Sequence, residues 1–120
     1  MPRNLAFIIE DDPQLSIIFS QAIKAAGFEI QRITDGDKAI IELEKGTPAL
    51  VILDLHLPGV DGNHILEFIR SQEHLNDTRI IVTTADARKA EELHEAADIV
   101  FVKPIRYSQL KDMAERLKPE

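Results

Sequence analysis

The sequence predicts an α/β protein with a doubly wound, five-stranded parallel sheet and helices on both faces. Short continuous apolar runs are typical of strands that are covered on both faces, and the chain contains five of them. They alternate with segments long enough to form helices, which favours parallel strands joined by right-handed crossovers. The expected strands are residues 5–9, 28–33, 50–54, 79–84 and 99–102.

The first helix is expected to follow three consecutive acidic residues. Asp12 suits the N-cap, because its side chain can accept hydrogen bonds from the first helical N–H groups, and Pro13 suits the first helical position. Apolar residues then recur with helical spacing and predict one buried stripe on a helix closed by Gly27. The stripe comprises Leu15, Ile18, Phe19, Ala22, Ile23 and Ala26.

Four further helices are expected between and after the remaining strands. Asp35 and Gly36 form a turn into the second helix, which ends near Gly46. The third is expected over residues 62–71 and the fourth over 88–97, where helix propensity is high but the apolar side is thin. The expected inward-facing residues are Ala39, Ile40 and Leu43, then Ile65, Leu66, Phe68 and Ile69, then Ala90, Leu93 and Ala97, and finally Leu110, Met113, Ala114 and Leu117.

Composition excludes several classes of protein. At 120 residues the chain is expected to form a single domain over residues 1–120, with no output domain and a core that needs no staples. The absence of cysteine excludes disulfides, thiol redox chemistry and thiolate zinc sites. Fourteen basic and 21 acidic residues give a net charge of −7, which argues against direct binding to nucleic acid or membrane. With no signal peptide or membrane-length apolar run, we expect a cytoplasmic protein.

Asp54 is the residue that most needs a functional explanation. It ends the buried run 50–53 and precedes Pro58-Gly59, so it lies at the carboxyl end of a strand. A buried carboxylate is costly unless it is paired, hydrated or metal-bound, and ligands of open α/β sheets bind at this edge. In the expected flavodoxin-like strand order 2-1-3-4-5, strands one and three flank the switch point, which places Glu10 and Asp11 beside Asp54.

Three carboxylates in one crevice repel each other. The repulsion is roughly 4 kcal/mol for one pair about 4 Å apart at a surface-like dielectric. A bound cation relieves it, and an all-oxygen cluster suits a hard divalent ion such as Mg²⁺, or Mn²⁺ in its place. Magnesium keeps several waters and needs only one or two carboxylates plus phosphate oxygens. The sequence therefore predicts a magnesium site that is completed by a phosphoryl group.

Four separate motifs, each at the end of an expected strand, resemble the receiver domain of two-component response regulators over essentially the whole chain. The motifs are Glu10-Asp11-Asp12, Asp54, Thr84-Ala85 and Lys103-Pro104. The resemblance implies a signalling domain, not an enzyme that turns over an external substrate. Asp54 would accept a phosphoryl group from a histidine kinase, a histidine phosphotransfer protein or a small phosphodonor, and the domain would then switch conformation toward an unidentified downstream effector.

The same resemblance implies roles for residues around Asp54. Asp11 and Asp54 would bind the metal directly together with the backbone carbonyl of His56, while Glu10 would act through water. Charge neutralisation and positioning are the main requirements of phosphoryl transfer.

On the phosphoryl side, the resemblance implies that Lys103 neutralises charge and Thr84 hydrogen-bonds an oxygen. The resemblance also implies that His56 and Asp86 flank the path by which water reaches the phosphoryl group. Because the reference pKa of histidine is about 6.5, we hypothesise that protonated His56 pairs with Asp86 and slows loss of the phosphoryl group.

Other interpretations compete with this one. A flavin carrier would need a phosphate-binding loop after the first strand, where this chain has three acids. A phosphatase of the haloacid-dehalogenase type would need a second acid at His56. A receiver-like interaction module that works without phosphorylation is the main alternative. Several polar residues are expected to be structural or exposed: Asp12 as a cap, Asp35, Asp37 and Asp61 in turns, and His64, His74 and His94 on the surface.

Two departures from the family pattern concern the end of the sheet. The position three before Lys103, usually aromatic, is Val100, and Phe101 is expected to point to the opposite face. Only nineteen positions separate Thr84 from Lys103, so the fourth helix or its exit loop must be short. We therefore expect activation to proceed without rotamer exchange at Val100.

Overall fold

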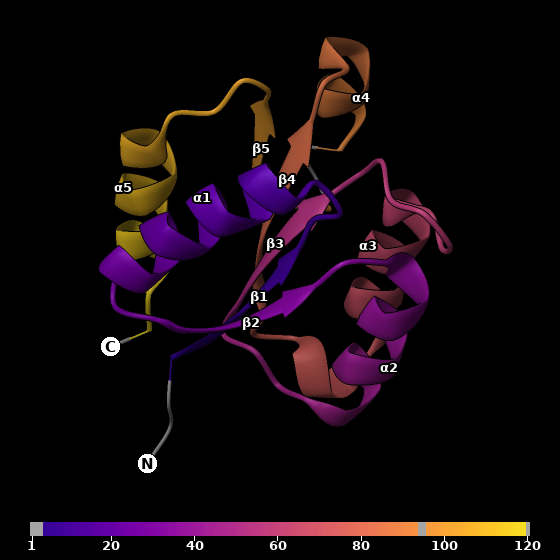
Figure 1. Ribbon diagram of the computed structural model, residues 1–120. Helices are drawn as coiled ribbons and strands as arrows, with labels where there is room; N and C mark the ends of the chain where they lie inside the picture. The colour runs from indigo at the N-terminus through magenta and orange to yellow at the C-terminus, as the bar shows by residue number, and fades with distance from the viewer. Residues whose placement is uncertain (1–3, 94–95, 120) are drawn as a thin grey trace.

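A five-stranded parallel sheet lies between two helical layers in the computed structural model, which describes residues 4–93 and 96–119 (Figure 1). The strand order is β2-β1-β3-β4-β5, which confirms the predicted order. The strands are β1 (Leu5–Ile9), β2 (Glu29–Ile33), β3 (Leu50–Asp54), β4 (Arg79–Thr84) and β5 (Ile99–Val102). The helices are α1 (Pro13–Ala25), α2 (Gly36–Lys45), α3 (Gly62–Ser71), the 3₁₀ helix η1 (Glu73–Leu75), α4 (Ala87–Glu92) and α5 (Tyr107–Leu117).

The core has two halves, one on each face of the sheet. α1 and α5 cover one face, and α2 and α3 cover the other, while α4 stands at the upper edge in Figure 1. Every residue of β3 is buried, as the continuous apolar run predicts for the central strand. Val100 packs into the half that contains α2 and α3, whereas Phe101 packs into the half beneath α1 and α5. The expectation that these two side chains face opposite ways is confirmed.

Aspartates begin four of the helices. Asp12 accepts hydrogen bonds from the N–H groups of Gln14 and Leu15 at 2.9 and 3.1 Å, and Pro13 occupies the first helical position. Asp35 and Asp61 cap α2 and α3 in the same way, and Asp86 caps α4. The structural interpretation of Asp12, Asp35 and Asp61 is therefore confirmed.

Three expectations about element limits and faces are wrong in detail. β2 begins at Glu29 rather than Phe28, because the Phe28 N–H bonds back to Ile23 O at the end of α1. Ile18 is 41% exposed, since the sheet-facing line of α1 runs through Phe19 and Ile23 and leaves Ile18 on its flank. α4 ends at Glu92, well short of residue 97.

The short α4 fits the close spacing of Thr84 and Lys103. Its amino terminus is fixed by Asp86, and its end is marked by a hydrogen bond from Leu93 N–H to Ala90 O. Among the residues that the structure describes, no helix is both long enough and apolar enough to cross a bilayer.

Gly62 allows α3 to start directly against the end of β3. A Cβ atom at this position would lie 2.5 Å from Leu55 Cα and 2.7 Å from Asp54 O, which is closer than real side chains approach backbone. The absence of a side chain therefore lets the helix pack beside Asp54.

Candidate functional site

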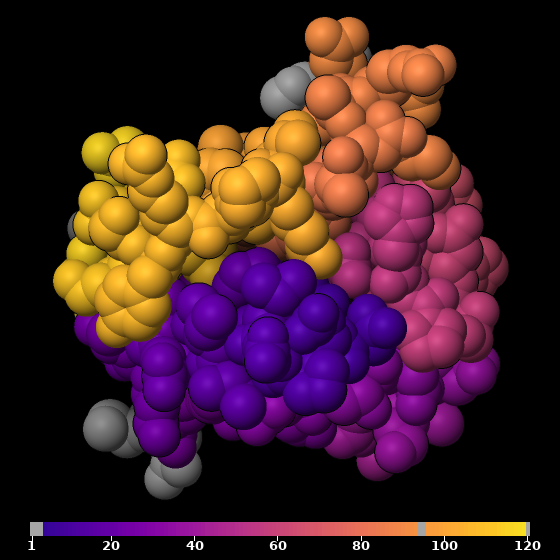
Figure 2. Space-filling view, turned by 45° about the horizontal axis from the view of Figure 1, so that its top comes forward, coloured from indigo at the N-terminus to yellow at the C-terminus, as the bar shows by residue number. Residues whose placement is uncertain are grey.

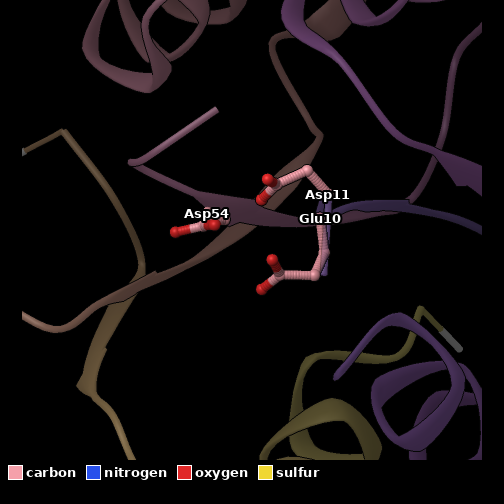
Figure 3. Close-up of side chains that lie close together, drawn as sticks. All are labelled: Glu10, Asp11 and Asp54. Atoms are coloured by element: carbon pink, nitrogen blue, oxygen red, sulfur yellow. The ribbon is translucent and has the colours of Figure 1, made fainter. Parts of the chain in front are cut away.

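Three carboxylates meet at the carboxyl edge of the sheet. Asp54 ends β3, and Glu10 and Asp11 follow β1 on the neighbouring strand. One oxygen from each lies within 4.8 Å of the others, and Figure 3 shows the side chains converging. Glu10 is 1% exposed and Asp54 2%, whereas Asp11 is exposed to solvent. The structure thus brings together the predicted cluster.

Lys103 supplies the positive charge at this cluster. Its Nζ lies 3.1 Å from Glu10 Oε1 and 3.5 Å from Asp54 Oδ1. The Lys103 N–H also donates to Thr84 O at 2.7 Å, which ties the loop after β5 to the end of β4. One ammonium group against three carboxylates leaves a net negative charge at the site when all three are ionised.

The surroundings of Glu10 raise its pKa. Burial raises the pKa of Glu10 from its usual 4.5 to about 7, and repulsion by Asp54 adds to the rise. The Asp12 N–H, which donates to Oε2 at 3.2 Å, and the Lys103 ammonium group work in the opposite direction. Near neutral pH the site therefore holds Glu10 partly protonated.

Asp54 has an oriented side chain. Its Oδ1 accepts a hydrogen bond from the His56 N–H at 3.1 Å, and the same oxygen is the one nearest to Lys103. Hard, oxygen-only donors with excess negative charge are the set that Mg²⁺ prefers, so the residues present fit a divalent cation. The hydrogen bond from Lys103 to Glu10 is not among the predictions, because the family resemblance places Lys103 only on the phosphoryl side of Asp54.

Thr84 and Asp86 form a connected turn after β4. Thr84 is buried, and its hydroxyl accepts a hydrogen bond from the Asp86 N–H at 3.0 Å. The Asp86 carboxylate in turn accepts from Arg88 N–H at 2.9 Å, and the His56 side chain is exposed. Within the described residues no hydrogen bond or ion pair joins His56 to Asp86, so their pairing stays a prediction.

His64 and His74 belong to no potential metal-binding group in the described part of the chain. His64 and His74 are exposed, as expected, and His74 Nε2 lies 2.8 Å from Leu43 O near the end of α2. His94 lies outside the described residues. Figure 2, in which the top of the molecule in Figure 1 is turned forward, shows the amino-terminal, central and carboxyl-terminal parts of the chain meeting at the carboxyl edge of the sheet.

The order of these motifs along the chain and their convergence match a known family. The family profile of the response regulator receiver domain matches residues 6–115. The chain belongs to this family. Receiver domains of response regulators are signalling domains, and the strand order and acidic crevice described above are those of this receiver domain.

Two relatives of this chain are named as transcriptional regulators. The chain is 36% identical over 120 residues to the phosphate regulon transcriptional regulatory protein PhoB of Rhizobium meliloti (strain 1021), covering 94% of this chain and 53% of PhoB. It is 33% identical over 113 residues to the DNA-binding dual master transcriptional regulator RpaA of Synechocystis sp., covering 92% of this chain and 46% of RpaA. The chain thus spans about half the length of these relatives.

Solved structures share the fold along nearly the whole chain. The response regulator protein TrrA from Thermotoga maritima, in complex with Mg²⁺-BeF, superposes with a TM-score of 0.84 at 28% identity, covering 95% of this chain and 98% of TrrA. A sensor protein from Polaromonas sp. JS666 superposes with a TM-score of 0.83 at 27% identity, covering 97% and 96% of the two chains.

Proposed function

We propose that this receiver domain accepts a phosphoryl group on Asp54 in a reaction that depends on Mg²⁺, for which Mn²⁺ can substitute. The observation that carries the proposal is the buried Asp54 carboxylate at the sheet edge, 3.5 Å from the Lys103 ammonium and clustered with Glu10 and Asp11. A carboxylate held in this way is oriented for nucleophilic attack by its hydrogen bond from the His56 N–H.

In the proposed reaction an Asp54 oxygen attacks the phosphorus atom of the donor while the bond to the donor's leaving group breaks. A bound magnesium ion would supply charge neutralisation for the phosphoryl oxygens. Asp11, Asp54 and the backbone carbonyl of His56 would hold the ion directly, and Glu10 would hold it through water. Lys103 alone does not balance the negative charge of the three acids, and the bound ion would balance the remainder.

Lys103 and Thr84 would bind the phosphoryl group once it is on Asp54. Lys103 would turn from Glu10 toward a phosphoryl oxygen, and the Thr84 hydroxyl would exchange its hydrogen bond from Asp86 N–H for one to the phosphoryl group. Because the Thr84 hydroxyl links directly to the turn before α4, this exchange would move that turn. The conformational change would therefore start at the loops after β4 and β5.

The phosphodonor would be a histidine kinase, a histidine phosphotransfer protein or a small phosphodonor in the cytoplasm. A downstream effector would read the change in conformation. The relative TrrA, solved with Mg²⁺-BeF, supports the metal and the phosphoryl position, and the regulators PhoB and RpaA support a signalling role. The net charge of −7 argues against direct binding of nucleic acid or membrane by this domain.

The test is incubation with acetyl phosphate and MgCl₂, followed by intact mass measurement. We expect the wild type to gain the mass of one phosphoryl group, and neither Asp54→Asn nor the wild type in excess chelator to gain it. Asp61→Asn, which alters a capping acid on α3 outside the cluster, is the matched control and should be labelled normally. Undiminished labelling of Asp54→Asn would refute the assignment, and absence of labelling with any donor would favour a phosphorylation-independent interaction module.

A further inference from the structure

Two buried hydroxyl groups lack a hydrogen-bond partner among the described residues. They belong to Ser20 in α1 and Thr83 in β4, and Thr83 is fully buried at 0% exposure. A buried hydroxyl that bonds to no protein group destabilises the folded state, so its presence calls for an explanation. Ser20 lies about two helical turns from Asp12, inside α1, whereas Thr83 lies beside the site.

Sheet register places the Thr83 side chain next to Asp54. Thr83 pairs with Asp54 on one side and with Phe101 on the other. Register partners in adjacent parallel strands project to the same face, so all three side chains share the face covered by α1 and α5. Thr84, the next residue, projects to the other face. The hydroxyl of Thr83 is thus on the side of the sheet from which Asp54 and Glu10 approach each other.

The Lys103 side chain crosses the strand that carries Thr83. Lys103 follows β5, an edge strand, yet its Nζ reaches Asp54 at the end of β3 and Glu10 directly after β1. Because β4 lies between β5 and β3, the lysine side chain must pass β4 at the level of Thr83 and the residues that follow it. An ammonium group has three N–H donors; Lys103 donates one to Glu10 Oε1 at 3.1 Å, and Asp54 Oδ1 lies 3.5 Å from its Nζ.

We propose that Thr83 is a positioning residue, whose hydroxyl accepts a hydrogen bond from the Lys103 ammonium group when Lys103 withdraws from Glu10. This inference depends on the proposed function, in which a cation and a phosphoryl group take over the carboxylate oxygens that now hold Lys103. Withdrawal from Glu10 moves Nζ back past Asp54 toward β4, and the Thr83 hydroxyl is the buried acceptor on that path. The bond would hold the ammonium group against the phosphoryl group on Asp54.

The test compares variants that differ in one hydroxyl group. Thr83→Val keeps the shape of the side chain and removes the hydroxyl, Thr83→Ser keeps the hydroxyl, and Ser20→Ala removes the other unpartnered hydroxyl as a matched control. With acetyl phosphate and Mg²⁺ we expect Thr83→Val to be labelled about tenfold more slowly, as expected for losing one hydrogen bond to a charged group. Thr83→Ser should be labelled at close to the wild-type rate, and so should Ser20→Ala.

Three further measurements separate positioning from packing. In Thr83→Val the hydroxyl is removed without a cavity, so its denaturation midpoint in chelator should equal or exceed that of the wild type, although its labelling is slower. The Lys103 Cε resonance in ¹³C-lysine protein, assigned through Lys103→Arg, should shift on addition of Mg²⁺ and beryllofluoride in the wild type and Thr83→Ser, and should shift measurably less in Thr83→Val. In a Lys103→Ala background, Thr83→Val should cause no further decrease in the labelling rate.

Equal labelling rates and equal Lys103 shifts in Thr83→Val and the wild type would overturn the role of Thr83 while leaving phosphorylation of Asp54 intact. Failure of the wild type to be labelled would instead overturn the proposed function. If Thr83→Val does not fold, the pair Thr83→Ser and Thr83→Ala makes the same comparison. A slower rate for Ala than for Ser, with Ser20→Ala unchanged, supports the inference, and equal rates refute it.

Discussion

The carboxylates at the two edges of the sheet differ in how their charge is balanced. At the amino edge, Asp98 accepts hydrogen bonds from Arg70 at 3.2 Å, Arg79 at 3.1 Å and the Ile80 N–H at 2.7 Å. At the carboxyl edge, where Glu10, Asp11 and Asp54 cluster, Lys103 is the one cation of the described residues that pairs with these acids, at 3.1 Å from Glu10 and 3.5 Å from Asp54. One acid has two cations at the first edge, and three acids have one cation at the second.

This difference separates a structural carboxylate from a functional one. A buried charge whose partners are complete needs nothing else, whereas excess charge of one sign creates a demand for a ligand of the other sign. The raised pKa of Glu10 is a sign of this excess negative charge. Cavity size does not distinguish the two edges, because a cavity of about 620 Å³ lined by Arg70, Arg79 and Asp98 opens at the amino edge.

The largest expected effect comes from exchanging one carboxylate at each edge. Asp54→Asn should abolish labelling by acetyl phosphate without destabilising the fold in chelator, since it removes repulsion. Asp98→Asn should keep the labelling but lower the free energy of unfolding by about 2 kcal/mol, because Arg70 and Arg79 lose their shared partner. Intact mass and urea denaturation measure the two effects. A folded Asp98→Asn that is not labelled would contradict the comparison.

The pH dependence of stability should reveal the raised pKa of Glu10. With a folded-state pKa near 7 against 4.5 in the unfolded chain, its stabilising contribution is complete below pH 4.5 and is lost as pH rises to about 7. The loss is on the order of 3 kcal/mol. Glu10→Gln should remove this part of the decline. Urea denaturation in chelator from pH 5 to 8 tests it, and parallel curves for the two proteins would show that Glu10 titrates normally.

Magnesium should stabilise the protein through the carboxyl edge only. At a hundredfold excess over its Kd, a ligand that binds only the folded state adds about 2.7 kcal/mol, and the gain should be larger at pH 8 than at pH 6, where Glu10 holds a proton. Asp11→Asn should weaken binding more than Glu10→Gln, and Asp98→Asn should leave it unchanged. Thermal unfolding across a MgCl₂ titration measures this, and equal gains at both pH values would argue against competition between proton and metal.

A smaller effect is expected at the turn after β4. Thr84→Ala removes the acceptor of the Asp86 N–H and should cost about 1 kcal/mol of stability, yet the protein should still be labelled. Amide shifts caused by beryllofluoride should be concentrated after Thr84 and Lys103 in the wild type and be reduced after residue 84 in the variant. A dominant change at Val100 and its strand neighbours would contradict this route.

The smallest effect is expected from His56. His56→Ala should be labelled normally and should lose the phosphoryl group up to about twofold faster at pH 6, with little change at pH 8, because exposed charge pairs contribute little. Decay of phosphorylated protein from pH 6 to 8 measures this. Matching profiles for the wild type and His56→Ala would end the proposed pairing with Asp86.

The sequence by itself determined the elements and the candidate site. Continuous apolar runs identified the strands, and the limits of β1, β3, β4, β5 and α3 agree with expectation because polar, Gly or Pro residues lie close to the ends of each apolar run. The position of Asp54 at a strand end, and of Glu10 on the neighbouring strand, followed from parallel topology. Residue type and spacing suffice where the constraint is local.

Only the tertiary structure decided how the side chains share charge. The closer contact of Lys103 with Glu10 than with Asp54, the rise in the pKa of Glu10 and the unpartnered hydroxyl of Thr83 depend on atoms brought together from strands far apart in the chain. Helical periodicity also placed Ile18 inside, although it lies on the flank of α1 that packing leaves open. Burial and pairing are properties of the assembled sheet, because they depend on neighbours that no local pattern encodes.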